Sequence, residues 1–214
     1  VADAHSAGRC RRGRQWLSAP AASLTFSMLW RFSGPATKLS GLSLAVGVGL
    51  ARALESLGAQ GICLKWPNDV LLRRGDDYAK LAGILVELSS DRKGTQAVIG
   101  IGINLQCPLG SLPQPAAGLD QALVVLPDRH VVLAAILLTL ADTFETFAVD
   151  GFFGLKNDWQ ARHAWQGLPV QLLADEAKPM LGCCLGADND GALLLDPENG
   201  IQRIFSGDVS LRRL

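Results

Sequence analysis

Leu64-Lys65-Trp66-Pro67-Asn68-Asp69-Val70-Leu71-Leu72 is an apolar run broken by charged and amide side chains, and the chain returns as Lys80-Leu81-Ala82-Gly83-Ile84-Leu85-Val86-Glu87. Both runs have the length of a β-strand, and the segment between them contains Gly75, Asp76 and Asp77, which are typical of a turn. The two runs therefore predict a β-hairpin. An ordinary hairpin with charged ends is the alternative, but charged groups inside so apolar a segment favour a functional site.

Pro67 interrupts the first run. A proline has no N–H for the ladder of a central strand, so we expect the backbone to bend at this residue. The bend is expected to direct three polar side chains into a pocket, those of Lys65, Asn68 and Asp69.

Lys80 begins the return strand, and its orientation decides which face of the hairpin carries its charge. Alternation along a strand places Lys80 on the face of Ala82 and Ile84. A bulge at the turn would reverse this assignment.

Composition limits the class of protein. The chain has 214 residues and a mass of 22.7 kDa, enough for one large domain or one domain with a small module. Hydrophobic residues make up 49% and charged residues 19%, which indicates a compact globular protein and excludes a disordered one. The net charge is zero, so no global field favours nucleic acid, and a local basic segment becomes the charge feature to explain.

Cysteine usage and the chain start bear on location. The five cysteines lack the spacing of zinc or redox motifs, which fits a reducing cytoplasm. We expect neither a signal peptide nor a membrane span, because the longest apolar runs are too short or too rich in glycine. The chain begins at Val1 and not at a methionine, which suggests a fragment of a longer protein.

Gly8-Arg9-Cys10-Arg11-Arg12-Gly13-Arg14 is the basic segment, with four arginines in seven positions. Arginine binds phosphate through two parallel hydrogen bonds, and flanking glycines let backbone N–H groups approach an anion. The pattern predicts a phosphate-binding loop. A solvated basic loop or an RNA-binding tail fits the local composition equally well.

Residues 95 to 104 predict a strand with two unlike faces. One is apolar and belongs to the core, and it carries Ala97, Ile99, Ile101 and Ile103. The other carries Val98, Gly100, Gly102 and Asn104. Its glycines leave room for a flat ligand against the backbone, and Asn104 is placed to hydrogen-bond the ligand's polar edge. The alternative is that the glycines admit a packed helix or mark a bulge.

The remaining sequence predicts scaffold. Residues 24 to 30 alternate as an amphipathic strand, and the apolar spacing from Leu39 to Leu57 is helical and ends at Gly58. Residues 105 to 128 predict an irregular connection, and two helical stretches follow at 130–147 and 151–165, whose tryptophans we assign to the core. From Leu168 five short strands separated by turn signals predict a small β-barrel-like module.

Four motifs in order resemble the biotin protein ligases, which make biotinyl-AMP and transfer biotin to a carrier-protein lysine. They are Gly8 to Trp16, the Lys65-Trp66-Pro67-Asn68-Asp69 run with its Lys80 to Glu87 return, Gly100-Ile101-Gly102-Ile103-Asn104, and Gly207-Asp208-Val209-Ser210-Leu211-Arg212. The resemblance covers essentially the whole chain. It implies an α+β fold, with a mixed sheet packed with helices like that of class II aminoacyl-tRNA synthetases, followed by an SH3-like β-barrel. The expected domains are 1–166, catalytic and incomplete at its N-terminus, and 167–214.

The resemblance also implies roles for individual residues. The residues expected to neutralise charge in catalysis are Arg11, Lys65 and Lys80. Those expected to contact biotin are His5, Gly8, Arg9, Cys10, Arg11, Lys80 and Gly83. Those expected to contact the nucleotide are Arg12, Arg14, Trp16, Lys65, Asn68, Asp69, Gly102, Ile103, Asn104 and Arg212. Cys10 stands where the family has glycine and His5 where it often has glutamine, and both departures bear on biotin affinity.

The implied reaction uses ATP, biotin and Mg²⁺, with the metal held mainly by phosphates and Asp69 as the nearest carboxylate candidate. Scattered histidines argue against a metal site built by the protein alone. The expected partner is the biotin carboxyl carrier protein of acetyl-CoA carboxylase; a homodimer is left open, and DNA is expected only if a helix-turn-helix precedes the chain. The alternatives are a truncated, inactive module that binds an adenylate or a partner, and an RNA-binding protein, which the neutral pI disfavours.

Overall fold

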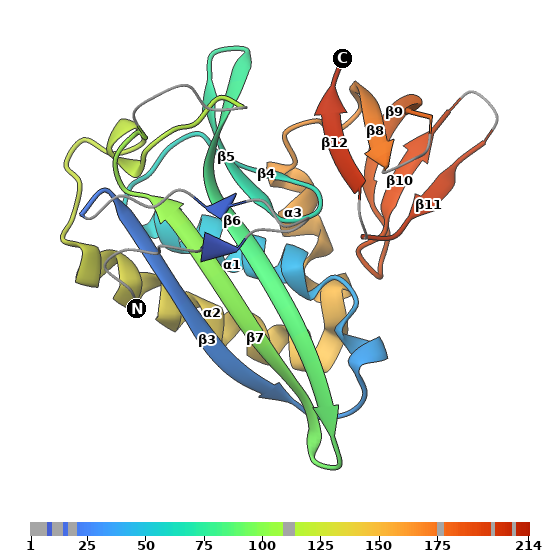
Figure 1. The fold of residues 1–214 in the computed structure, drawn as a ribbon, viewed down its shortest axis with the longest axis horizontal. Helices are drawn as coiled ribbons and strands as arrows, with labels where there is room; N and C mark the ends of the chain where they lie inside the picture. The colour runs from blue at the N-terminus through green and yellow to red at the C-terminus, as the bar shows by residue number, and fades with distance from the viewer. Residues whose placement is uncertain are drawn as a thin grey trace.

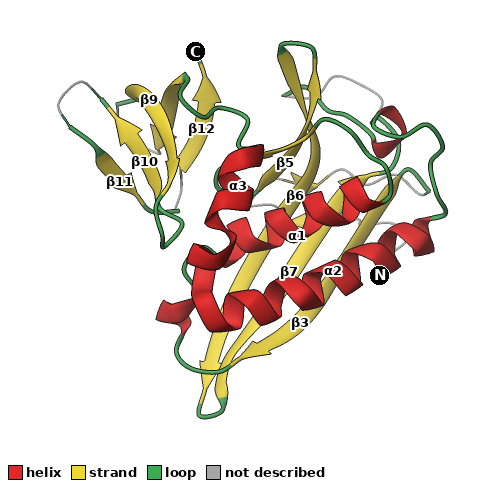
Figure 2. Ribbon diagram, turned by 180° about the vertical axis from the view of Figure 1, so that it is seen from behind, coloured by secondary structure: helices red, strands yellow, loops and turns green. Residues whose placement is uncertain are grey.

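The computed structural model describes residues 21–108, 114–174, 178–197, 200–206 and 209–214, and the backbone of residues 8–9 and 15–16. They form two five-stranded sheets, a two-stranded ribbon of residues 8–9 and 15–16, and the helices that cover the first five-stranded sheet (Figures 1 and 2). The α+β architecture with a small C-terminal β-module is therefore confirmed.

The first sheet has the strand order β3-β7-β6-β5-β4, with antiparallel pairing throughout. Its strands are β3 (Ser23–Phe32), β4 (Ile62–Lys65), β5 (Asp69–Arg74), β6 (Asp77–Asp91) and β7 (Gly94–Asn104). Two isolated parallel bridges, Leu64 with His163 and Lys80 with Ala116, make it mixed in part. Helices α1 (Leu42–Ser56) and α2 (Arg129–Asp150) lie across one face of this sheet (Figure 2).

Helix α1 is the central element of the core, and most of its residues are buried. A Cβ added at Gly49 would lie 2.8 Å from Leu140 Cδ2 on α2, so the glycine allows the two helices to approach closely. The helix ends as predicted at Gly58, which has a φ of +96°. There the N–H of Gly58 donates to Glu55 and that of Ala59 to Leu54, which satisfies two terminal carbonyls.

Helix α2 is longer and more apolar than the sequence led us to expect. Together with η4 (Gly151–Leu155) and α3 (Lys156–Arg162) it forms a 34-residue helical segment, and an 18-residue window of this segment has a mean hydropathy of 1.8, so it is long and apolar enough to cross a membrane by length and composition alone. By this criterion the segment is not too short, contrary to the reason given for expecting no membrane span, but the core helix of a globular protein meets the same criterion. Its buried side chains instead face the core, where Phe144 packs 5.7 Å from the ring of Phe32.

The second sheet has the strand order β11-β10-β9-β8-β12, so the last strand closes back beside the first (Figure 1). Its strands are β8 (Pro169–Ala174), β9 (Met180–Ala187), β10 (Leu193–Asp196), β11 (Gln202–Ile204) and β12 (Val209–Arg213). All five lie where the alternation and turn signals placed them.

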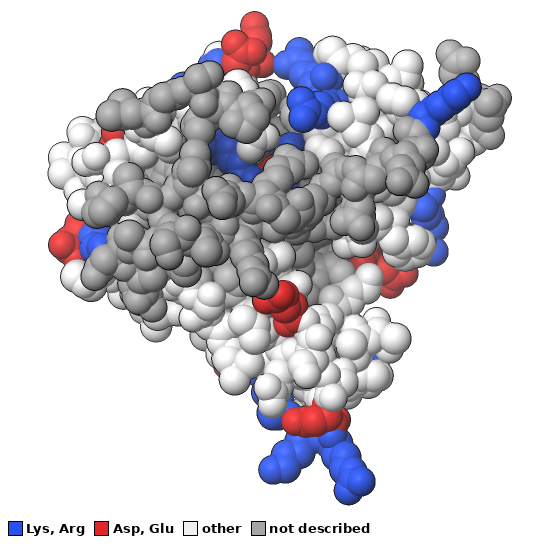
Figure 3. Space-filling model, viewed as in Figure 1, with Lys and Arg blue, Asp and Glu red and all other residues white. Residues whose placement is uncertain are grey.

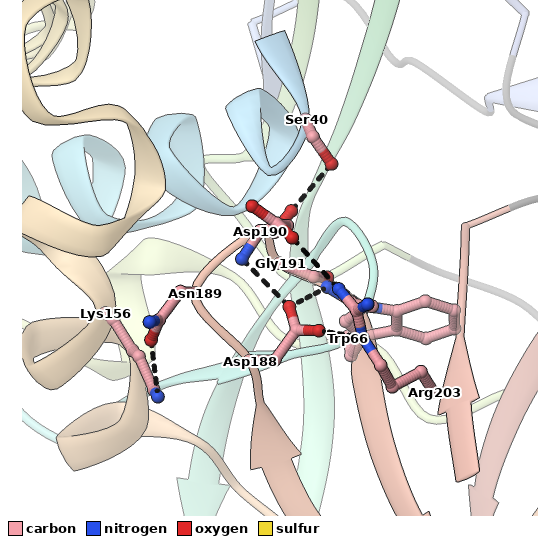
Figure 4. A network of polar contacts seen from close by, with 9 residues as sticks. Ser40, Trp66, Lys156, Asp188, Asn189, Asp190, Gly191 and Arg203 are labelled. Carbon is pink, nitrogen blue, oxygen red and sulfur yellow. Dashed lines mark hydrogen bonds and ion pairs between the residues drawn. The ribbon is translucent and has the colours of Figure 1, made fainter. Parts of the chain in front are cut away.

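The turn between β9 and β10 docks on the first part of the chain (Figure 4). The indole N–H of Trp66 donates to the carbonyl of Gly191 at 3.1 Å, and Ser40 Oγ donates to the carbonyl of Asp190 at 2.7 Å. Gly191 has a φ of +81°, and a Cβ there would lie 2.7 Å from the Cα of Gly41, so backbone meets backbone at this joint.

The linker between α3 and β8 is also fixed to the first sheet. His163 forms a parallel bridge with Leu64, and the N–H of Ala164 donates to the Leu64 carbonyl at 2.9 Å. The His163 ring is 7% exposed and stacks on Trp159 at 4.4 Å. Among the described residues neither of its ring nitrogens has a hydrogen-bond partner. Burial lowers the pKa of His163 to about 4; Gln166 opposes the shift, but its amide Nε2 already donates to the carbonyl of Leu185.

This environment predicts a pH-dependent stability. The folded state holds His163 neutral, whereas the unfolded chain protonates it with a pKa near 6.5. The free energy of unfolding is therefore highest above pH 6.5 and decreases as the pH falls toward 4, by about 3 kcal/mol at most. His163→Phe keeps the stacking and removes the titration. We expect urea unfolding between pH 4 and 8 to give a shallower acid loss for this variant, and superimposable pH profiles would contradict the assignment.

Candidate functional site

A row of five residues crosses the first sheet on the face away from the helices. The strand register places Lys65 opposite Asp69, Asp69 opposite Gly83, Gly83 opposite Gly102 and Gly102 opposite Thr25. Residues directly opposite one another share a face, so these five form one polar line with a glycine floor at its centre. We call it the polar row.

The neighbouring row, one residue along each strand, is apolar. It consists of Leu64, Val70, Ala82, Ile103 and Leu24, none of which is more than 1% exposed. Alternation thus gives the sheet a core face under the helices and a face suited to a ligand. Figure 3 shows blue atoms of Lys or Arg and a little red of Asp or Glu near the middle of this second face.

Two lysine ammonium groups of the site contact the same carboxylate, that of Asp69. Lys80 Nζ lies 2.6 Å from Asp69 Oδ1, and Lys65 Nζ lies 3.2 Å from Asp69 Oδ2. The three side chains are only 11 to 18% exposed. Burial would raise the pKa of Asp69, but Lys80 and then Lys65 outweigh it, so the pKa lies below its ordinary value. The cluster is a fixed arrangement of one negative and two positive charges.

Lys80 reaches this cluster because of a bulge. The register shifts between Val70 and Leu71, whose partners are Ala82 and Lys80, so that Leu81 is an extra residue on β6. The prediction that Lys80 shares the face of Ala82 and Ile84 was therefore wrong: Lys80 lies with Asp69 on the glycine face. A bulge was considered as a feature that would reverse the assignment, but nothing in the sequence indicates that one is present.

The bend at Pro67 is confirmed. The Trp66–Pro67 peptide is cis, and the chain turns there from β4 into β5 so that Lys65 and Asp69 lie opposite each other. Asn68, predicted to contact the nucleotide, also has a contact within the protein. Its Nδ2 donates to the carbonyl of Ile84 at 2.7 Å, which ties the bend to β6. One N–H of the Asn68 side chain is thus used by the protein backbone.

The residues of β7 that were predicted to contact the nucleotide differ in what they offer to a ligand. Gly102 belongs to the polar row, whereas the side chain of Ile103 lies in the core, which leaves only its backbone for a ligand. Asn104 is 4% exposed, and its Nδ2 lies 3.0 Å from the carbonyl of Ala117 and 3.4 Å from that of Lys80. Asn104 therefore braces the backbone that carries Lys80.

Other predicted residues are not brought into the cluster by the described structure. His5, Cys10, Arg11, Arg12 and Arg14 lie outside the described residues. Of Gly8, Arg9 and Trp16 only the backbone is described: β1 (Gly8–Arg9) pairs with β2 (Gln15–Trp16) in a small ribbon that Figure 1 shows on the side of the sheet away from the helices. Arg212 is exposed on β12 of the second sheet.

Two site residues were missed. Thr25 was assigned to a scaffold strand, yet its Oγ1 is buried on the polar row and has no partner among the described residues. Trp165 does lie in the core to which it was assigned, but its contact with the site was not predicted: its ring centroid lies 5.2 Å from Lys65 Nζ. Alternation could have placed Thr25 on the glycine face, but no local signal connects Trp165 with Lys65, which is a hundred positions earlier in the chain.

A cavity of about 430 Å³ adjoins the bend at Pro67. Residues from both parts of the chain line it. They include Ser40 just before α1, Ser43 in its first turn, Leu85 on β6 and Phe205 beyond β11.

The described residues offer no ready-made metal site. Among them no three His, Cys, Asp or Glu side chains gather to hold an ion, and both carboxylate oxygens of Asp69 face lysines.

Comparison with known proteins identifies the family. Residues 1–104 match the model of the biotin/lipoate A/B protein ligase family, and residues 167–212 match that of the biotin protein ligase C terminal domain. The chain is 35% identical over 211 residues to the biotin--[acetyl-CoA-carboxylase] ligase of Paracoccus denitrificans, covering 95% of this chain and 85% of that protein. This chain belongs to the biotin protein ligase family.

Two further relatives of this ligase family extend the comparison. The bifunctional ligase/repressor BirA of Salmonella typhimurium is 38% identical over 99% of this chain, and the chain spans 66% of its length, just under two thirds. The structure of the biotin protein ligase from Aquifex aeolicus in complex with biotin and ATP superposes with a TM-score of 0.81 at 31% identity, covering 99% of this chain and 87% of that one. The polar row lies within the first matched range, and the second matched range covers the second sheet except for Arg213 at its end.

Asp69→Asn tests the charge cluster. The substitution removes the negative charge and leaves two ammonium groups close together, so we expect it to lower the free energy of unfolding by roughly 3 to 5 kcal/mol. Adding Lys65→Met to Asp69→Asn removes one of the two cations and should recover part of the loss. Urea unfolding at pH 7 measures both effects, and an Asp69→Asn variant as stable as the parent would show that the carboxylate does not hold the cluster.

Proposed function

We propose that this protein activates biotin with ATP as biotinyl-5'-AMP and transfers the biotin to a lysine of a biotin carboxyl carrier protein. The observation that carries the proposal is the pair of largely buried ammonium groups on one carboxylate, beside a glycine floor, in a chain of the biotin protein ligase family. A relative that superposes closely was solved with biotin and ATP bound.

The first step is attack of the biotin carboxylate on the α-phosphate of ATP, with release of pyrophosphate. Negative charge builds on the reacting carboxylate and on the phosphates, and Lys80 and Lys65 supply positive charge fixed in advance. Because Asp69 holds both ammonium groups in place, they need no reorganisation as the charge develops. Arg9 and Arg11 are expected to add to this charge from the segment near the start of the chain.

The second step is attack of a deprotonated carrier lysine on the carbonyl of the mixed anhydride. An amide bond forms, AMP leaves, and the amine proton passes to solvent. No bond to the enzyme is needed, so catalysis rests on positioning and on electrostatics. Gly83 and Gly102 serve this positioning, because a floor without side chains lets a flat ligand lie against the backbone.

Mg²⁺ fits this scheme only as an ion held by the phosphates of ATP. Asp69, the nearest carboxylate candidate, is already engaged by two lysines.

We also propose a cytoplasmic location, which the four free cysteines among the described residues support. The catalytic domain would end near residue 166, where the linker gives way to the second sheet.

The decisive experiment is incubation with biotin, ATP and a carrier domain, followed by an avidin blot and by measurement of pyrophosphate release. We expect biotinylation that depends on ATP and on the carrier lysine. Pyrophosphate release without transfer would reduce the function to adenylation. Absence of both activities would overturn the proposal and favour an adenylate-binding or partner-binding module.

Lys80→Ala should abolish adenylation and leave the fold intact. Its side chain is partly exposed, so truncation opens no core cavity, while loss of charge at the reacting groups is expected to lower kcat by about 10²-fold or more. Pyrophosphate release measures the effect. Lys93→Ala, at the exposed tip between β6 and β7, is the matched control and should retain activity. Near-normal adenylation by Lys80→Ala would remove Lys80 from the mechanism.

Gly102→Val tests the glycine floor. Valine suits a β-strand, but its branched carbons would fill the face on which we place the nucleotide. We expect the KM for ATP to rise at least tenfold, and more than the KM for biotin. Ser27→Val adds the same side chain at an exposed site on the same face and should leave both unchanged. Equal loss of both ligands, or unfolding, would count against the nucleotide position.

A further inference from the structure

Trp165 is the one aromatic side chain that the described structure places over a cation of the proposed site. Its ring centroid lies 5.2 Å from Lys65 Nζ, within the range of a cation–π contact. Trp165 is 8% exposed and the Lys65 side chain 12%, so water screens the contact only weakly. Its indole Nε1 has no hydrogen-bond partner among the described residues, so packing fixes the ring.

The backbone around Trp165 is anchored on both sides. Toward the first sheet, the N–H of Ala164 donates to the carbonyl of Leu64, the residue before Lys65. Toward the second sheet, the N–H of Gly167 donates to the carbonyl of Cys184 at 2.7 Å, and Gln166 Nε2 donates to that of Leu185 at 2.9 Å. The linker therefore joins the strand that carries Lys65 to β9 of the second sheet.

Helix α3 fixes the linker from a third direction. Arg162, its last residue, forms two hydrogen bonds with the carboxylate of Glu55 on α1, at 2.8 and 2.9 Å. Trp159 on the same helix stacks on His163. With three anchors the indole has little freedom to leave Lys65.

For Lys65, a contact with the Trp165 ring has a chemical advantage over a contact with a second carboxylate. Asp69 is shared with Lys80, so it cannot alone hold Lys65 as firmly as a dedicated partner would. An aromatic face attracts the ammonium group but does not neutralise it and accepts no full hydrogen bond. Apart from the N–H that it donates to Asp69, Lys65 thus keeps its N–H donors, and its positive charge, for an anionic ligand.

We propose that Trp165 is a positioning residue that holds the Lys65 ammonium group toward the phosphates of ATP, and that it links the second sheet to the adenylation site. The proposal rests on the adenylation function proposed above. Trp165 touches neither ligand in this scheme and acts only through Lys65.

Trp165→Leu removes the ring and Trp165→Phe keeps an aromatic face. For adenylation we expect Trp165→Leu to lower kcat/KM for ATP by roughly three- to thirtyfold, the range of a cation–π contact, with the KM for biotin unchanged. Trp165→Phe should recover most of the loss. Trp30→Leu is the matched control, because Trp30 packs on Phe144 from β3 at the opposite edge of the sheet and should leave kcat/KM for ATP unchanged.

An NMR measurement tests the contact between Trp165 and Lys65 independently of activity. With lysine labelled at Cε, the Lys65 methylene protons should be shifted upfield by the indole ring current, assigned by their loss in Lys65→Arg, and should move downfield in Trp165→Leu. A Lys65 signal at its ordinary position would overturn the proposal, as would parent-like kcat/KM in Trp165→Leu or an equal loss in Trp30→Leu. If the parent makes no biotinyl-AMP, the adenylation function fails, while the ring-current shift still decides the contact.

Discussion

The carboxylate of Asp69 is the constraint on which the site depends. Two ammonium groups from different strands would repel each other in a recess with little water, and a single carboxylate between them makes the arrangement stable. This requirement fixes the surrounding backbone: Asp69 must follow a bend, Lys65 must precede it, and Lys80 must be turned onto the same face. The bend at Pro67 and the extra residue Leu81 each provide one of these conditions.

The sheet separates stability from function by alternation. The apolar row of Leu64, Val70, Ala82, Ile103 and Leu24 packs under the helices, and the polar row one residue away faces the proposed ligands. Since the two rows are adjacent along every strand, a slip by one residue would exchange them and bury the lysines. The packing of the core and the position of the site are thus determined by the same register.

Local signals in the sequence predicted local structure well. Pro67 marked the bend, Gly58 marked the end of α1, and alternation with turn residues marked the five strands of the second sheet. The side of the sheet on which Lys80 lies was not predictable, because a bulge depends on pairing with another strand. The roles of Asn104 and Trp165 depend on contacts with distant segments, which composition and spacing do not record. The resemblance to biotin protein ligases named the chemistry, but not which side chains brace it.

The joint between Gly41 and Gly191 also bears on how the molecule assembles. Asp188 accepts hydrogen bonds from the backbone of Asp190 and Ala192, so the turn holds its shape through contacts within the second sheet's own segment. The buried indole of Trp66, beside the bend at Pro67, donates its hydrogen bond to that turn, 125 positions later in the sequence. Contacts between such distant segments close late in folding, because the entropy of the intervening chain must be lost first. Gly191, Ala192 and Phe205 of the C-terminal segment line the cavity beside Pro67, so the wall of that cavity is incomplete until the second sheet has been made and docked.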